Sequence, residues 1–465
     1  MAKTAFTNTN VRGIKPRQTN LQTKRWTDSA FEATHGSRRK RIKKRKSSVD
    51  AHIVLTDSRR PPNLLILGAS GHVAQAFLIR LSTRRADFGR VVLLDANDGV
   101  LRSPYLNHEL LDYTFIHRHL RFPDDAMEYR QLLHQHRVNV VLDVTDLDTL
   151  PVLTATDEAG VSYVNTALNE SGRGIAEVVS ELHPTRAEGS RAPHILSSGM
   201  NPGVVNIWVW HGFEMYGPPL EIVHFEYDTS VPITGWKPMI TWSRKEFLTE
   251  TVWERTGQVV NGTLRPSSGN ALENREDLRA ILQPVMPLPT YPRGMLVLHE
   301  ENVKLGAKLG ASSRYIYAID PRTMTFMEQA LARRGRVNID DLELGDNTSI
   351  PLAGSDTIGV CLRYADKQVY YLHSLANQDV VGTNATCAQV AVGADAALHA
   401  LSSEKLTPRI YFATDLYDTA YSDVVFGSLR VEHFVFETLN DSLAPSLHIP
   451  RLYSPIKAMN ASVAA

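Results

Sequence analysis

The chain has 465 residues, 43% of them hydrophobic, with 50 Lys and Arg against 50 Asp and Glu. This length exceeds what one hydrophobic core usually supports, so it predicts two or three domains. The sequence has no apolar run near the roughly 20 residues of a membrane span and no signal peptide, which predicts a cytoplasmic protein without membrane association. The two cysteines, Cys361 and Cys387, are too few for a disulfide framework. We expect both to pack as small hydrophobic side chains in a reducing compartment.

The balanced net charge hides a strong asymmetry. Residues 1–61 contain 16 Lys and Arg against 4 Asp and Glu, and the remainder contains 34 against 46. Such a polar leader cannot bury enough apolar surface to offset its ordering entropy, so we expect residues 1–61 to be disordered. Its basic run 38–46 is compatible with nuclear or organellar targeting, with contact to an anionic surface, or with an unselected extension. The acidic remainder favours a cationic substrate over nucleic acid.

A strand, turn and helix pattern opens the folded part. Residues 63–67 are an apolar strand, residues 68–74 a Gly-containing turn, and a helix is expected through about Leu81. Such a turn lets a pyrophosphate rest on the helix N-terminus, with Ser70 in place of the second Gly of the strict fingerprint. The next strand, residues 91–94, ends in an acid that favours NAD over NADP. The expected cofactor-binding residues here are Gly68, Ser70, Gly71, His72, Val73 and Asp95.

Further alternation of strands and helices predicts an α/β fold, with a Rossmann-type doubly wound parallel sheet over residues 62–200. Because ligands bind beyond the carboxyl ends of parallel strands, we expect Thr145, Asp146 and Asn165 to face the nicotinamide or ribose. The alternative is that they are solvated loop residues. The remaining elements of this domain are expected as strands at 113–116, 138–142 and 162–164 and as helices at 126–136 and 150–159.

The segment 196–205, Leu-Ser-Ser-Gly-Met-Asn-Pro-Gly-Val-Val, opens a second region. We expect a strand to end at Ser197, and Asn201 to cap a helix that has Pro202 at its first position. Residues 201–380 are expected to form an α+β substrate and dimerisation domain, and residues 381–465 to return to the first domain. Strands are expected at 221–227, 295–299 and 314–318, helices at 245–255, 322–333 and 383–401, and an irregular excursion at 257–292.

Three clusters in the second region could carry chemistry. Glu226 and Asp228 share one face of a strand; Trp242 precedes Glu246 and Glu250, which are one helical turn apart; and His299-Glu300-Glu301 ends an apolar strand, where a loop would present it. Each also has an ordinary interpretation as a surface acid pair, a core tryptophan or a polar strand end. Together they could hold an ammonium group by ion pairing and cation–π contact, with His299 for proton transfer. Their spacing matches no metal-binding pattern, so no metal is expected.

With these motifs in order, residues 62–440 resemble the bacterial-type homospermidine synthases, a branch of the saccharopine dehydrogenase-like superfamily. The resemblance departs from the family at Ser70, in the basic leader, and at Asn169, where the family carries a Glu that Glu170 could replace. The segments that carry it are residues 199–204, the spacing from Trp242-Ser243 through Phe247 to Glu250, residues 299–301, residues 356–360, and Asn384-Ala385-Thr386 followed by Gln389-Val390.

The resemblance implies a redox-neutral transfer in a homodimer with tightly held NAD. Putrescine is oxidised to an imine, ammonia leaves, a second putrescine adds, and the new Schiff base is reduced to sym-homospermidine. It implies that Trp242 stabilises a cationic amine or iminium, that Glu226 and Glu250 bind the distal ammonium, and that His299 or Glu301 transfers protons. Asn201 would position the substrate against the nicotinamide.

Two other functions fit the same sequence. A saccharopine or carboxynorspermidine dehydrogenase-type enzyme would need arginines for an α-carboxylate, and Arg244, Arg255 and Arg293 are available. A catalytically silent dinucleotide-binding scaffold would bind NAD without turning over any diamine.

Overall fold

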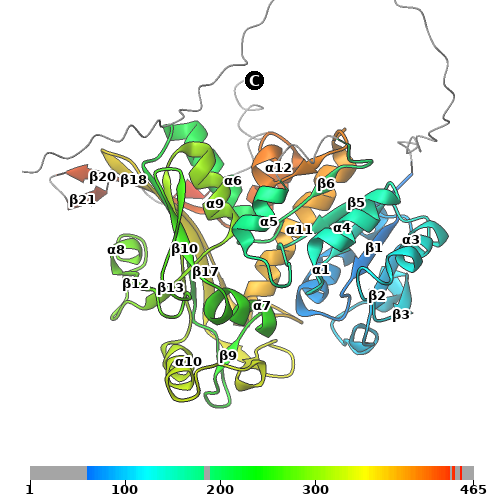
Figure 1. The fold of residues 1–465 in the computed structure, drawn as a ribbon, viewed down its shortest axis with the longest axis horizontal. Helices are drawn as coiled ribbons and strands as arrows, with labels where there is room; N and C mark the ends of the chain where they lie inside the picture. Colours follow the sequence, from blue (N-terminus) through cyan, green and yellow to red (C-terminus); the bar gives the residue numbers. More distant parts are fainter. Residues whose placement is uncertain (1–59, 183–188, 440–441, 446–450, 453–465) are drawn as a thin grey trace, which may run out of the picture. The chain divides into compact units, whose positions relative to one another are not determined.

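The computed structural model describes residues 60–182, 189–439, 442–445 and 451–452, and the leader predicted at 1–61 falls almost wholly outside them. The fold is α/β, with a parallel Rossmann-type sheet and a larger mixed sheet (Figure 1). Both cysteines are buried and free, as expected. Within the described residues, no helix has the length and apolar character needed to cross a membrane.

The first sheet has seven strands in the order β19-β6-β5-β4-β1-β2-β3. All its pairings are parallel, so the carboxyl ends of its strands share one edge. The central strands are fully buried because they are continuous apolar runs covered on both faces. Its strands are β1 (Leu64–Leu67), β2 (Val91–Asp95), β3 (Tyr113–His117), β4 (Val140–Asp143), β5 (Ser162–Asn165), β6 (His194–Ile195) and β19 (Ile410–Tyr411).

The helices of this region follow the predicted alternation. Each expected strand and helix from residue 63 to residue 165 is present, with ends that differ by one or two residues. The helices are α1 (His72–Ser82), α2 (His108–Leu111), α3 (Ala126–Gln135), α4 (Thr149–Glu158) and α5 (Ile175–Glu181).

The second sheet has eleven strands, and its main path runs β11-β10-β14-β7-β17-β18-β20-β21. Strand β7 pairs in parallel with β14 on one side and antiparallel with β17 on the other. This places β7, with Glu226 and Asp228, in the middle of the sheet. The strands are β7 (Glu221–Asp228), β10 (Gly257–Val260), β11 (Thr263–Pro266), β12 (Arg275–Asp277), β13 (Arg293–Val297), β14 (Ser312–Ala318), β17 (Ser355–Arg363), β18 (Lys367–Ala376), β20 (Glu432–Leu439), β21 (Ser442–Pro445) and β22 (Arg451–Leu452).

Two short sheets and, besides the long helix Ala385–Ser403, six α-helices complete the second region of the described residues. The two-stranded pairs are β9 (Met239–Ile240) with β15 (Glu343–Leu344), and β8 (Val231–Pro232) with β16 (Leu352–Ala353). The helices are α6 (Val204–Tyr216), α7 (Arg244–Leu248), α8 (Arg279–Leu282), α9 (Glu300–Leu309), α10 (Pro321–Arg334) and α12 (Ala420–Ser428).

Three predictions for this region are wrong in part. The excursion predicted at 257–292 contains β10, β11, β12 and α8, because β10 and β11 form a hairpin at the edge of the sheet. The helix predicted at 245–255 changes to a π-helical turn over Thr249–Trp253. His299-Glu300-Glu301 is no loop: His299 caps α9, with the Asn302 side chain accepting from its backbone N–H. Local sequence did not reveal these features because tertiary pairing fixes them.

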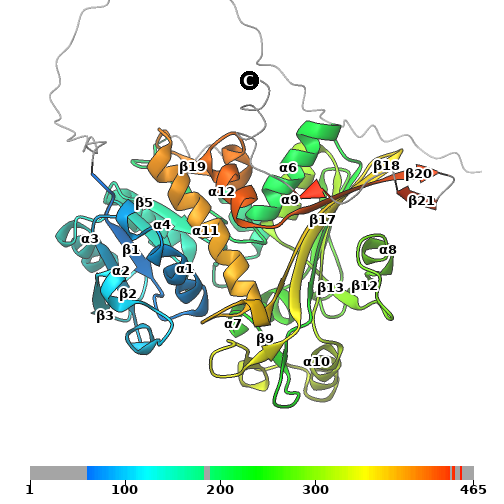
Figure 2. The ribbon, with the colours of Figure 1, turned by 180° about the vertical axis from the view of Figure 1, so that it is seen from behind.

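Helix α11 (Ala385–Ser403) runs between the two sheets in both views (Figures 1 and 2). Its buried alanines belong to the same hydrophobic core as residues of α1, α6 and β17. Small side chains permit this close approach: a Cβ at Gly393 would lie 2.1 Å from the carbonyl oxygen of Gly199. After α11 the chain adds β19 to the first sheet and β20 to the second.

The expected cap at Asn201 is also wrong. Helix α6 begins at Val204, and its N-cap is Gly203, with a φ of 127° that a side chain rarely adopts. The N–H of Gly199 donates to the carbonyl of Pro202 over 2.9 Å, which closes a tight turn before the helix starts. The Asn201 side chain is therefore free of the helix and reaches toward the second sheet.

Candidate functional site

A groove of about 640 Å³ lies at the carboxyl ends of the strands of the first sheet. Gly68 in its turn has a φ of 78°, and a Cβ there would lie 2.9 Å from Cγ2 of Thr145, so only glycine fits. The predicted cofactor residues that line this groove are Gly68, Ser70, Gly71, His72, Val73, Asp95, Thr145 and Asp146.

The groove fits a dinucleotide. Helix α1 begins after Gly71 without any side-chain cap, so the backbone N–H groups of its first turn are available to a pyrophosphate. Ser70 has a structural role instead: its N–H donates to Asp95 over 2.8 Å, and its hydroxyl donates to the Asn97 carbonyl over 3.0 Å. The residue that departs from the strict fingerprint thus ties the turn to the end of β2.

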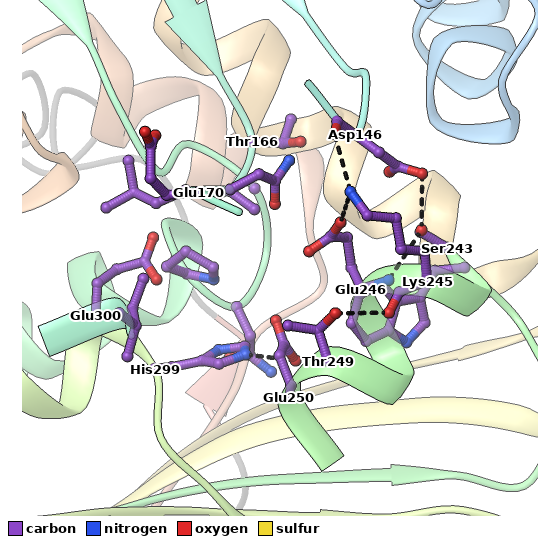
Figure 3. Close-up of a pocket in the computed structure, with 18 of the residues that line it drawn as sticks. Asp146, Thr166, Glu170, Ser243, Lys245, Glu246, Thr249, Glu250, His299 and Glu300 are labelled. Atoms are coloured by element: carbon purple, nitrogen blue, oxygen red, sulfur yellow. Dashed lines mark hydrogen bonds and ion pairs between the residues drawn. The ribbon is translucent and has the colours of Figure 1, made fainter. Parts of the chain in front are cut away.

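A second cavity of about 440 Å³ adjoins the groove. Thr145, Asp146, Trp242, Ser243 and Lys245 line both spaces. Figure 3 shows Glu170 and Glu300 on one side of this cavity and Asp146, Ser243, Lys245 and Glu246 on the other. Of the predicted catalytic residues, five meet on its walls: Asn201, Glu226, Trp242, Glu250 and His299.

Two predicted site residues lie behind these walls. Glu301 is fully buried and lines neither cavity. Asn165 also lines neither cavity: its Oδ1 accepts from the Ser197 backbone and its Nδ2 donates to the Ala167 carbonyl. Asn165 therefore braces the end of β5 and the segment after β6, and it does not face the groove as we expected.

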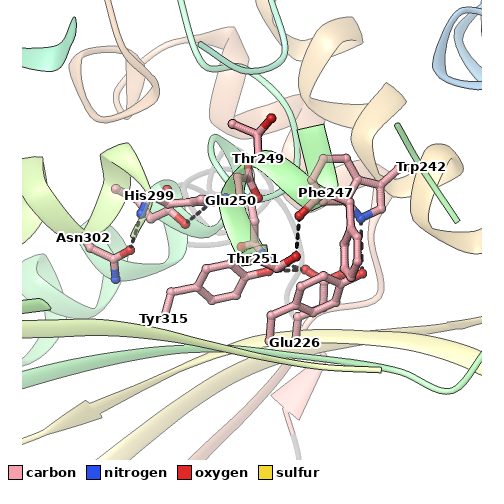
Figure 4. Close-up of polar contacts among 12 residues, drawn as sticks. Glu226, Trp242, Phe247, Thr249, Glu250, Thr251, His299, Asn302 and Tyr315 are labelled. Carbon is pink, nitrogen blue, oxygen red and sulfur yellow. Dashed lines mark hydrogen bonds and ion pairs between the residues drawn. The ribbon is translucent and has the colours of Figure 1, made fainter. Parts of the chain in front are cut away.

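His299 lies between two carboxylates, and Figure 4 shows that of Glu250 beside it. Its Nε2 is 2.9 Å from Oε2 of Glu250, and its Nδ1 is 3.3 Å from Oε1 of Glu301. Burial disfavours the imidazolium, but Glu250 and Glu301 outweigh it and raise the pKa of His299 well above its ordinary value. The two carboxylates therefore favour the imidazolium form of His299, which can donate a proton.

Glu226 is buried and accepts hydrogen bonds from two side chains. Nδ2 of Asn201 donates to its Oε2 over 2.9 Å, and the Tyr315 hydroxyl donates to the same oxygen over 2.5 Å. Burial raises the pKa of Glu226 to about 7, although both hydrogen bonds oppose this. Nearby, Nε1 of Trp242 donates to the Tyr317 hydroxyl over 3.2 Å, which fixes the indole in the cavity wall.

The cavity wall is rich in acids, and Glu254 is the one among them that the sequence analysis did not consider. Burial, with Glu250 and Glu246 adding to it, raises the pKa of Glu254 to about 7, and burial with Glu301 does the same for Glu300. The i, i+4 spacing of Glu246 and Glu250 was a local signal, but Tyr315 gave none, because only its pairing with β7 brings it to Glu226. The acids on the wall are Asp146, Glu170, Glu226, Glu246, Glu250, Glu254 and Glu300.

Few cations oppose these acids among the described residues. Lys245 lies 3.0 Å from Glu246 and donates to the Asp146 carbonyl. Arg173 lines the cavity but pairs with Glu177 and Glu181. Of the arginines available for a carboxylate, Arg244 lines only the groove, whereas Arg255 and Arg293 are exposed and line neither space.

Comparison with known proteins agrees with this architecture. Residues 64–192 match the model of the saccharopine dehydrogenase NADP binding domain, so the first sheet is a nicotinamide-dinucleotide-binding domain. Comparison with curated proteins gave no match.

Two solved structures resemble the fold. One is the homospermidine synthase of Legionella pneumophila in complex with NAD, with a TM-score of 0.65 and 16% identity, covering 84% of this chain and 94% of that one. The other is the apo saccharopine dehydrogenase (L-Glu forming) of Saccharomyces cerevisiae, with a TM-score of 0.52 and 11% identity, covering 80% of this chain and 99% of that one. At these identities the similarity is one of fold.

Proposed function

We propose that this protein is an NAD-dependent transferase of the homospermidine synthase type, which joins two putrescines to sym-homospermidine and releases ammonia. The observation that carries the proposal is the wall of the 440 Å³ cavity, where seven acidic side chains and Trp242 adjoin the dinucleotide groove. Carboxylates bind ammonium groups by charge-assisted hydrogen bonds, and an indole face attracts a cation. A diamine dication fits this wall better than any anionic substrate.

NAD would supply the hydride acceptor for the first amine and return the same hydride to the final imine, so the cycle has no net redox change. Gly68, Gly71 and the start of α1 would hold its pyrophosphate. Thr145 and Asp146 line both spaces, so they would contact the region where cofactor and amine meet. The Asp95 carboxylate would accept from a ribose hydroxyl and repel a 2′-phosphate.

Side chains of the cavity would perform the remaining steps. Glu226 and Glu250 bind the ammonium that does not react, and Trp242 stabilises the cationic amine or iminium. The neutral amine of the second putrescine adds to the imine carbon. His299, protonated between Glu250 and Glu301, then donates the proton with which the first nitrogen leaves as ammonia, and the proton lost by the incoming nitrogen restores His299. The resulting imine would take up the hydride. Glu170 lines the cavity beside Asn169 and could serve in place of the family's Glu.

The arginine positions argue against a carboxylated substrate. A dehydrogenase of the saccharopine or carboxynorspermidine type would bind an α-carboxylate through a free guanidinium. Arg173 on the cavity wall is already paired with two glutamates, and the wall around it is acidic. A carboxylate placed here would meet like charges.

Incubation with putrescine and a trace of NAD tests the proposal. We expect homospermidine and ammonia by mass analysis, with no net NADH by absorbance. Net NADH with a carboxylated amine would indicate the dehydrogenase function. Tight NAD binding without turnover of either amine would indicate a scaffold.

A further inference from the structure

Glu226 is a buried acid whose side chain borders the 440 Å³ cavity. Glu226 is 5% exposed and lies on the central strand β7. Its side chain reaches solvent through the cavity that it lines. Both Asn201 and Tyr315 donate to Oε2, and among the described residues no hydrogen bond to Oε1 is found. Oε1 is thus the oxygen left for a ligand in the cavity.

The groups around Glu226 supply more negative than positive charge. Asp228 lies on the same face of β7, and Asp356 of β17 is the cross-strand partner of Asp228. His299 is the nearest cation, but it is already paired with Glu250 and Glu301. The titratable groups that face Glu226 are Asp228 and His224 on β7, Tyr315 and Tyr317 on β14, Asp356 on β17, Glu250 on the π-helical turn, and His299 on α9.

The two neighbouring aspartates differ in their hydrogen bonds. Asp228 accepts from the Ser230 N–H over 2.8 Å and from the Thr241 hydroxyl over 2.7 Å, so it is well solvated by the protein as an anion. Asp356 accepts from Gln389 at one oxygen, whereas its Oδ1 is buried without a partner among the described residues. An anionic Asp228 and a protonated Asp356 fit these contacts, since three such buried carboxylates cannot all ionise.

We infer that Glu226 is protonated in the free protein and exchanges this proton for the ammonium group of the substrate. The inference rests on the proposed function and adds a coupling between amine binding and proton release. A protonated Oε1 would present an O–H donor to an ammonium that also has only donors, so the two cannot bind each other. The carboxyl group loses its proton to solvent, and the carboxylate then accepts from the ammonium. Burial raises the pKa of Glu226 to about 7, which agrees with this exchange.

The coupling fixes the pH dependence of amine binding. Below the pKa of Glu226, each bound amine has to expel one proton, so the dissociation constant rises about tenfold for each unit that the pH falls. Glu226→Gln cannot release a proton and should reduce this slope by one unit. Glu276→Gln is the control, because Glu276 lies on β12 of the same sheet, pairs with Arg314 and lines neither cavity.

The experiment uses the full chain loaded with NADH, so that no hydride can leave the amine. Putrescine and n-butylamine are the probes. Infrared difference spectroscopy follows the C=O stretch of a protonated carboxyl group. A proton lost by the amine instead of by a carboxyl group leaves this band unchanged. We expect amine binding at pH 6 to remove such a band in the unmodified protein and in Glu276→Gln. The part of the band that is due to Glu226 should be missing in Glu226→Gln.

The outcomes separate the exchange from the proposed function. If n-butylamine removes the band but putrescine gives no homospermidine, the exchange stands and the proposed reaction fails. If neither amine removes the band, or if Glu226→Gln leaves the band and the pH slope unchanged, the exchange is wrong. Calorimetry in two buffers of different ionisation enthalpy checks the number of protons released independently.

Discussion

Nε2 of His299 lies 2.9 Å from Oε2 of Glu250, and this ion pair joins the first residue before α9 to the π-helical turn after α7. The residues are 49 positions apart in the chain, yet both line the same cavity wall. The pair fixes the orientation of the imidazole and keeps its second nitrogen toward Glu301.

Glu250→Gln removes the charge and keeps the size of the side chain. Loss of a charge-assisted hydrogen bond of about 1.5–3 kcal/mol should weaken putrescine use roughly ten- to a hundredfold, while NAD stays bound. Steady-state kinetics with putrescine and fluorescence titration with NAD measure the two effects. An unchanged dependence on putrescine, or better turnover of a carboxylated amine, would contradict the assigned role.

The same pair predicts a pH dependence of stability. The pKa of His299 is raised by folding, so its contribution is complete below the unfolded value of about 6.5 and is lost as the pH rises through the folded pKa. The difference in melting temperature between the unmodified protein and Glu250→Gln should therefore be largest near pH 6 and decrease toward alkaline pH. Thermal melts across this range check it; a difference that grows with pH would rule out a charged His299.

Trp242 is expected to act on a cation as well as to pack against Phe247. Cation–π attraction is worth roughly 0.5–2 kcal/mol, so Trp242→Phe should retain part of the rate and Trp242→Ala should lose more. Both variants lose the hydrogen bond to Tyr317, which makes Trp242→Phe the control for that contact. The prediction requires similar melting temperatures; unfolding of Trp242→Ala would show that the indole is a core residue.

Asp95 is expected to select NAD. Asp95→Ala should narrow the preference for NAD over NADP by removing repulsion of the 2′-phosphate. It should also lower the melting temperature, because the carboxylate accepts the N–H groups of Ser70 and Asn97. Dissociation constants for both cofactors test the first effect, and equal binding of both by the unmodified protein would contradict it.

Gly393 marks the contact of α11 with the turn that carries Asn201. A Cβ here would lie 2.1 Å from the Gly199 carbonyl oxygen, so Gly393→Ala should destabilise the protein by about 1–3 kcal/mol and lower activity. Gly174→Ala is the matched control, because nothing lies within 4 Å of its added Cβ. Denaturant unfolding compares the two; equal stabilities would show that the helix can shift without cost.

The sequence by itself determined the dinucleotide-binding half. Residues 64–67 and 91–94 are apolar runs, the turn at Gly68 and Gly71 is local, and α1 follows at once. Short-range pattern and the handed βαβ connection therefore suffice. The sequence also predicted which acids share a face. Strand alternation does so for Glu226 and Asp228, and helical spacing does so for Glu246 and Glu250. These features depend on residues only a few positions apart.

Only the tertiary structure decided how these pieces make a site. Tyr315 contacts Glu226 because β14 pairs with β7. His299 contacts Glu250 because α9 starts opposite the π-helical turn. The side chain of Asn201 does not cap α6, because the turn at Gly203 makes the helix begin at Val204. Asn165 does not line the groove because its side chain hydrogen-bonds to the Ser197 N–H and the Ala167 carbonyl. Such contacts join residues far apart in the chain, and the hydrophobic burial that brings them together is not directional, so no local pattern encodes them.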